Sequence, residues 1–94
     1  MPRIKSASEK AAGKLISAIQ KEWGEELGFP IAEESEDVMG LAHSLLQART
    51  SSKMKEVLDG ATITQYLGEE WVSNHPSVIP AIESLIKAME QEDA

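Results

Sequence analysis

Apolar residues recur at three- and four-residue spacing along almost the whole chain, and this period constrains the fold more than any other feature. Such spacing places side chains on one face of an α-helix, whereas a half-buried β-strand needs strict alternation. Strict alternation is absent, and β-branched residues are sparse. Hydrophobic residues make up 41% of the 94 residues, which is ample for a core. We therefore predict that residues 1–94 form a single all-α domain.

The pattern predicts five helices, one of them short, in a compact antiparallel bundle. The first helix should start at a capping box formed by Ser6 and Glu9 and end near Glu26, because Gly28 and Pro30 are stop signals. The second and last helices should lie at the centre of the bundle. The other helices are expected from an N-cap at Ser35 to Arg49, from Lys53 to Leu58, from Thr62 to Val72 across Gly68, and from a cap at Ser77 onward with Pro80 in the first turn.

Both ends of the chain carry charge. We interpret residues 1–6 as a basic mobile arm and residues 91–94 as an acidic tail that frays, because acids at a helix C-terminus oppose the helix dipole. No cysteine is present, which excludes disulfides, zinc–thiolate sites and a thiol nucleophile. No signal-peptide pattern and no run of about 20 apolar residues is visible. We therefore expect a cytoplasmic protein without a membrane partner.

The sequence offers few groups for catalysis or metal binding. We interpret His43 as a polar or partly buried helix residue, and His75, before Pro76, as a surface or capping residue. No histidine spacing places two ligands on adjacent helix turns, so we predict no metal site. Glu69 and Glu70 point about 100° apart on a helix, which does not suit a catalytic pair. Nucleotide-binding and nucleophile motifs are absent. We predict a protein that is not an enzyme and needs no cofactor.

The charge is segregated along the chain. The first 21 residues hold five bases and one acid, whereas the remainder holds 15 acids and four bases. Lys10, Lys14 and Lys21 fall on the helix face opposite the apolar residues. This face is either a solvated exterior or a docking surface for an acidic partner, which is another protein or a second copy of the chain.

Two aromatic residues of the expected fourth helix are further contact candidates. Tyr66 and Trp71 point in different directions on a helix, so packing within a small bundle does not readily bury both side chains. Trp and Tyr are favoured anchors at protein interfaces. Whether Tyr66 and Trp71 belong to the core or to an interface stays open at this point.

We therefore predict a protein–protein interaction or regulatory module, self-association included, that acts through Lys10, Lys14, Lys21, Tyr66 and Trp71. The alternative is a small nucleic-acid-associated factor that uses the basic N-terminal arm and the first helix. The acidic body disfavours nucleic acid, because it repels phosphates. The segment from Lys53 to Val72 has a helix–turn–helix outline, but its second helix offers Glu69 and Glu70 and no base to DNA.

Overall fold

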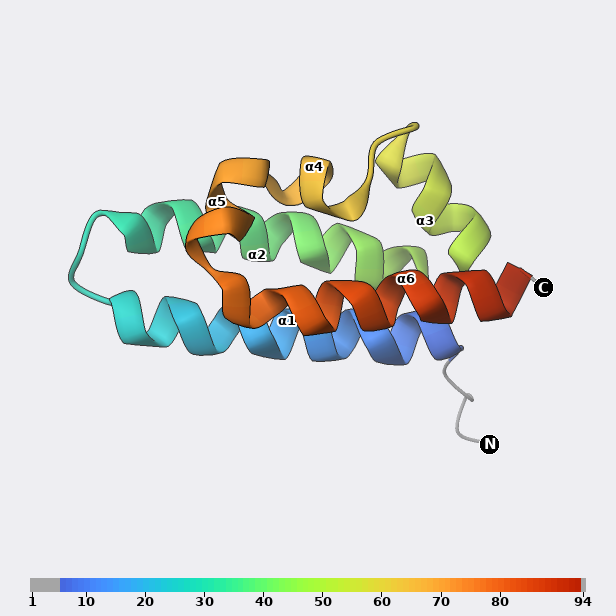
Figure 1. The fold of residues 1–94 in the computed structure, drawn as a ribbon, viewed down its shortest axis with the longest axis horizontal. Helices are drawn as coiled ribbons and strands as arrows, with labels where there is room; N and C mark the ends of the chain where they lie inside the picture. The colour runs from blue at the N-terminus through green and yellow to red at the C-terminus, as the bar shows by residue number, and fades with distance from the viewer. Residues whose placement is uncertain (1–5, 94) are drawn as a thin grey trace.

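The computed structural model describes residues 6–93, and in that range every regular element is helical (Figure 1). Helix α1 runs antiparallel to both α2 and α6, while α3, α4 and α5 lead the chain back along one side. The predicted all-α bundle is confirmed. The elements are α1 (Ala7–Glu26), α2 (Ile31–Ala48), α3 (Ser51–Leu58), α4 (Ile63–Leu67), α5 (Glu69–Asn74), the 3₁₀ turn η1 (Pro76–Val78) and α6 (Ile79–Asp93).

Helix α1 is the centre of the bundle, since it packs against both α2 and α6. Its buried residues come in neighbouring pairs, Ala11 with Ala12 and Leu15 with Ile16, and such pairs widen the apolar stripe enough to meet two helices. In α2, by contrast, Met39 and several other apolar residues are only partly buried. The expectation that the second and last helices form the centre is therefore wrong.

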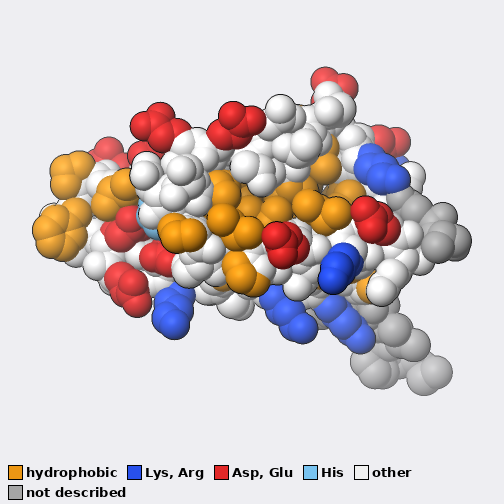
Figure 2. Space-filling view, viewed as in Figure 1, with side chains coloured by type: hydrophobic (Ala, Val, Ile, Leu, Met, Phe, Trp, Pro, Cys, Tyr) orange, Lys and Arg blue, Asp and Glu red, His pale blue; other side chains and the backbone are white. Residues whose placement is uncertain are grey.

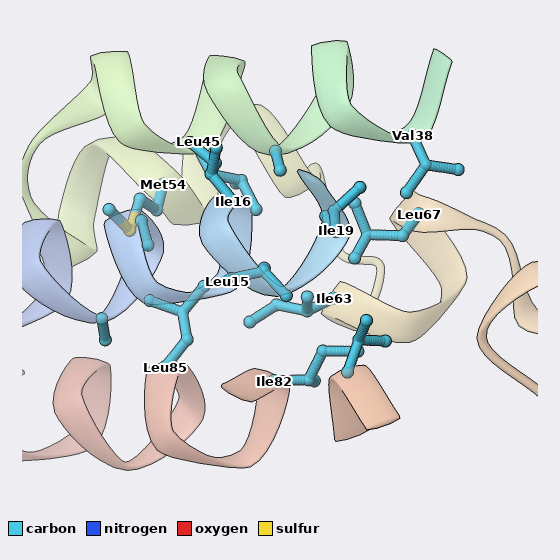
Figure 3. Packing of buried hydrophobic residues seen from close by; sticks show 14 of the residues in the cluster. Leu15, Ile16, Ile19, Val38, Leu45, Met54, Ile63, Leu67, Ile82 and Leu85 are labelled. Atoms are coloured by element: carbon cyan, nitrogen blue, oxygen red, sulfur yellow. The ribbon is translucent and has the colours of Figure 1, made fainter. Parts of the chain in front are cut away.

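The core lies along this central helix (Figure 3). Leu15 faces Leu85 of α6, and Ile16 lies beside Leu45 of α2. Leu15, Leu45 and Leu85 are each 0% exposed. Complete burial of such a side chain contributes roughly 1.5–3 kcal/mol relative to an exposed one. The core therefore ties the three long helices together, and α3 and α4 cover its remaining side.

Local capping signals set several helix boundaries as predicted. The Ser6 hydroxyl accepts a hydrogen bond from the Glu9 backbone N–H at 3.1 Å, and α1 ends at Glu26. Thr62 and Gln65 form a complete capping box at the start of α4. Helix α3 ends at Asp59, which takes the left-handed conformation. These caps satisfy backbone groups that the helix itself leaves unpaired.

Several boundaries differ from the prediction, among them the start of α3, which lies at Ser51 and not at Lys53. Helix α2 begins at Ile31 without a side-chain cap, so Ser35 is not an N-cap but a buried residue inside the helix. The expected fourth helix breaks at Gly68, whose φ of 115° is open to glycine but strained for other residues. Ser77 lies in η1 and donates its hydroxyl hydrogen bond to Glu22 instead of capping α6. Pro80 does lie in the first turn of α6.

The two ends of the described chain meet at the start of α3. Residues 1–5 of the expected arm lie outside the described residues, but Ser6 belongs to the fold and donates to the Arg49 carbonyl at 2.5 Å. Helix α6 continues through Asp93, and the Glu92 carboxylate accepts a hydrogen bond from the Ser51 backbone N–H. The frayed tail expected from residue 91 is therefore wrong for Glu92, while residue 94 lies outside the described range.

The position of Glu92 explains this correction. Its own helix dipole disfavours an acid at the end of α6, but the carboxylate lies at the N-terminus of α3, where negative charge is favoured. The Ser51 N–H lowers the pKa of Glu92 below its usual value; burial opposes this effect, and the Ser6 and Ser8 groups add to it. Among the described helices, none is long and apolar enough to cross a membrane.

Candidate functional site

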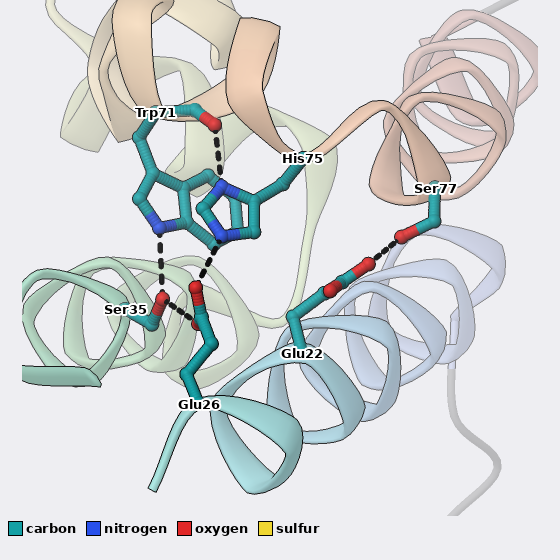
Figure 4. A network of polar contacts seen from close by, with 6 residues as sticks. All are labelled: Glu22, Glu26, Ser35, Trp71, His75 and Ser77. Carbon is teal, nitrogen blue, oxygen red and sulfur yellow. Dashed lines mark hydrogen bonds and ion pairs between the residues drawn. The ribbon is translucent and has the colours of Figure 1, made fainter. Parts of the chain in front are cut away.

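A polar network joins the end of α1 to α2 and α5 (Figure 4). The Ser35 hydroxyl donates to Glu26 Oε1 at 2.6 Å and accepts from the Trp71 indole N–H at 3.0 Å. His75 Nε2 lies 2.8 Å from Glu26 Oε2, and His75 Nδ1 lies 2.7 Å from the Trp71 carbonyl oxygen. The imidazole also stacks on the Trp71 indole, with ring centroids 4.2 Å apart. The network is therefore a closed ring of contacts.

The partners of His75 define its protonation. A carbonyl oxygen and a carboxylate only accept hydrogen bonds, so both contacts are hydrogen bonds when each ring nitrogen carries a proton and the imidazole is cationic. Burial lowers the pKa of His75, but the hydrogen bonds to Glu26 and Trp71 and the charges of Glu26 and Glu22 outweigh it, so the pKa is raised. Burial likewise raises the pKa of Glu26, but the hydrogen bonds from Ser35 and His75 and the His75 charge prevail and lower it. The two shifts are those of a partly buried ion pair.

The network corrects two sequence interpretations. His75 is 5% exposed, so it is not a surface residue, although it does hold the C-cap position of α5 as the alternative interpretation expected. Trp71 is 2% exposed and belongs to the core, so it is not accessible to a partner. Tyr66 is half-buried and packs against the same core. The Ser35 hydroxyl points to Glu26 and not to the imidazole, and it is fully buried. The arrangement therefore has the chemistry of a structural clamp between three helices.

His43 lies on the surface of α2, away from this network. Within residues 6–93, no cluster of three or more His, Cys, Asp or Glu side chains is arranged to hold a metal ion. Glu69 and Glu70 are both exposed in the first turn of α5, where acids complement the helix dipole. Their placement at this helix start has a simple electrostatic reason.

Lys10, Lys14 and Lys21 are exposed on the face of α1 that is turned away from the buried stripe, as predicted. We call these three residues the lysine face. Figure 2 shows Lys and Arg side chains gathered along the edge formed by α1, while Asp and Glu side chains predominate over the opposite side. The charge segregation of the sequence is therefore also a segregation in space.

The structure adds an apolar groove that the sequence did not indicate. Its volume is about 420 Å³, and its apolar lining comes from α3, α4 and α6 through Leu58, Ile63, Ile86 and Met89. Lys55 and Glu90 stand at its border. Figure 2 shows hydrophobic side chains across the middle of this face. No family model, no curated protein and no solved structure matches this chain, so these surfaces carry the functional evidence.

Proposed function

We propose that the protein is a non-enzymatic protein-interaction module and that it binds a second copy of itself through the lysine face. The single observation behind this proposal is the position of Lys10, Lys14 and Lys21, which project from α1 without taking part in its packing. Lysines in such a position are available to an acidic surface at no cost to the fold. The proposal includes a cytoplasmic location, which fractionation of the source cells tests.

The chain supplies the acidic counterpart itself. Residues 22–48 contain seven acids and neither lysine nor arginine. A basic face and an acid-rich surface on one molecule are complementary between two copies. Such complementarity raises the association rate and the specificity more than the affinity, and salt screens it. The self-association should therefore weaken as the salt concentration rises.

Sedimentation velocity at low and high salt concentration tests this function. The wild-type protein should associate at low salt and dissociate at high salt. Lys10→Glu with Lys14→Glu should abolish the association, while Lys53→Glu with Lys87→Glu, the same charge change on other helices, should leave most of it. A monomer at every salt concentration would refute self-association through the lysine face.

Nucleic acid is the competing partner for the same lysines. A fluorescence titration with duplex and single-stranded DNA at low salt separates the two partners. No binding is expected, because phosphates that reach the lysine face also meet the acidic body of the protein. Binding that the Lys10→Glu and Lys14→Glu substitutions abolish would replace the protein partner by nucleic acid.

A further inference from the structure

The connection between α1 and α2 holds two large apolar side chains in solvent. Phe29 is 65% exposed and Leu27 is 55% exposed, the highest values among the large hydrophobic residues in the described range. Figure 2 shows hydrophobic side chains at the end of the molecule where this connection lies in Figure 1. Single exposed apolar residues are ordinary, so exposure alone does not mark a binding surface. Two further observations distinguish this pair.

The first observation is that hydrogen bonds on both sides hold the connection. The Phe29 backbone N–H donates to the Glu26 carbonyl at 2.9 Å, and the Phe29 carbonyl accepts from the Ala32 N–H at 3.1 Å. Gly28 takes a φ of 95°, which lets the chain turn sharply between the helices. Directly next to the turn, the Glu26 side chain is fixed by His75 and Ser35. The backbone that carries Phe29 is therefore held in place, which reduces the backbone entropy lost on binding.

The second observation concerns charge: the exposed charged residues that flank this pair in the sequence have a single sign. The nearest charged residues along the chain on either side are acids, and Glu25, Glu33 and Glu34 among them are exposed. Glu26 is paired with His75, but neither lysine nor arginine accompanies the exposed acids between residues 22 and 48. An identical connection from a second copy would be repelled, and so would an anionic membrane surface. A partner that binds favourably here has an apolar surface at the centre of its binding site and positively charged residues around that surface.

We propose that Leu27 and Phe29 form the apolar anchor of a docking tip for a protein that presents an apolar surface bordered by Lys or Arg. In such an interface the buried aromatic side chain supplies most of the affinity, and the polar border excludes water and selects the partner. The hollow beside Lys21 on a second copy is lined by Glu22 and Glu25 as well as Ala18, so the lysine face does not offer an apolar surface bordered by positive charge alone. The apolar groove of a second copy has one acid, Glu90, and one base, Lys55, in its lining, so its charge does not select an acidic tip.

The test uses the full chain, labelled with ¹⁵N, and two synthetic amphipathic helical peptides. One peptide is built from Leu and Lys, and in the other Glu replaces every Lys. The Leu–Lys peptide should perturb the backbone amide signals of residues 25–34, and the Leu–Glu peptide should not. Phe29→Ala should weaken binding of the Leu–Lys peptide about tenfold or more. Ile86→Ala, which truncates another exposed apolar side chain, is the matched control and should bind like wild type.

A second pair of matched variants tests the acidic residues that flank the docking tip. Glu33→Gln with Glu34→Gln should weaken peptide binding and reduce its salt dependence, while Glu83→Gln with Glu90→Gln on α6 should change it much less. Phe29→Ala should unfold at the wild-type temperature, because most of the side chain is already in solvent. Equal binding of the Leu–Glu peptide, or wild-type affinity of Phe29→Ala, would overturn the proposal.

Two further measurements test whether the docking tip binds a membrane surface or a second copy of the chain instead. Binding to phosphatidylglycerol vesicles that Phe29→Ala abolishes would assign the tip to a membrane surface and overturn the proposal. Loss of self-association in Phe29→Ala by sedimentation would assign it to a second copy, with the same consequence. Peptide binding should persist in the Lys10→Glu and Lys14→Glu variant, so failure of the docking tip and failure of the lysine face are distinguishable.

Discussion

Removal of the Ser35 hydroxyl should be among the most damaging small substitutions in the protein. Ser35→Ala leaves the Trp71 indole N–H without its acceptor in a site where Ser35 is 0% exposed. It also takes one hydrogen bond from the Glu26 carboxylate. An unpaired buried donor costs about 1–3 kcal/mol, and a hydrogen bond to a charged group contributes about 1.5–3 kcal/mol. Alanine is the better helix former by about 0.5 kcal/mol, so the net loss of unfolding free energy should be about 2–5 kcal/mol.

Urea unfolding followed by tryptophan fluorescence measures this loss, with Ser44→Ala as the control on the same helix. The Ser44 hydroxyl bonds only to the Gly40 carbonyl one turn earlier, so its removal should change the unfolding free energy by less than about 0.5 kcal/mol. The thermal midpoint of Ser35→Ala should fall by about 4–8 °C for each kcal/mol lost. If Ser35→Ala is no less stable than Ser44→Ala, the network does not clamp the helices and the reasoning is refuted.

The remaining predictions concern pH and the backbone. The folded-state pKa of His75 is raised above the ordinary 6.5, so its contribution to the unfolding free energy is complete below pH 6.5 and is lost as the pH rises through the folded-state pKa. In unfolding titrations at several pH values, His75→Gln should remove this dependence of the unfolding free energy on pH. The pKa of Glu26 is lowered from 4.5, so its contribution is present above pH 4.5 and disappears as the pH falls through the folded-state value. Gly68→Ala should destabilise by about 1 kcal/mol or more because of its φ of 115°, whereas Gly40→Ala, with open space at its Cβ inside α2, should stabilise by about 0.5–1 kcal/mol. Thermal melts that give both glycine substitutions the same sign would contradict this assignment.

Local chemistry accounts for the part of the fold that the sequence predicted correctly. A cap acts within four residues, so Ser6 and the Thr62–Gln65 pair could be recognised from spacing alone. The lysine face follows from helical periodicity for the same reason, because position on one helix decides which side chains face solvent. Features that depend on a few neighbouring residues can be predicted from a single sequence.

The clamp was missed because its members are far apart in the chain. His75 meets Glu26 across 49 positions, and Trp71 meets Ser35 across 36. Ser35 also has the residue type and the acidic neighbours of an N-cap, but α2 starts earlier, at Ile31. No spacing rule predicts which distant partners a serine or histidine will find. The burial of His75 and Trp71 therefore became visible only in three dimensions.

Glycines show the same limit within one helix. Gly13, Gly24 and Gly40 lie inside continuous helices, whereas Gly68 divides two short ones. Each has the same intrinsic cost in a helix of about 1 kcal/mol relative to alanine. Of these four glycines, only Gly68 takes a positive φ, and the resulting break separates α5, which carries Trp71, from α4. Tertiary packing decides whether a glycine is tolerated within a helix or breaks it. The local sequence pattern does not reveal that packing.

The central place of α1 has a consequence for synthesis on the ribosome. Its apolar stripe faces both α2 and α6, so one side stays uncovered until residues 78–89 have been made. At roughly 5–20 residues per second, the interval between completion of α2 and of that stretch is about 2–8 s. During this time α1 and α2 form a helical hairpin in which the side of α1 that later contacts α6 remains exposed. Exposed hydrophobic surface of this kind makes an incomplete chain prone to aggregation, and the packing of α6 against α1 covers it.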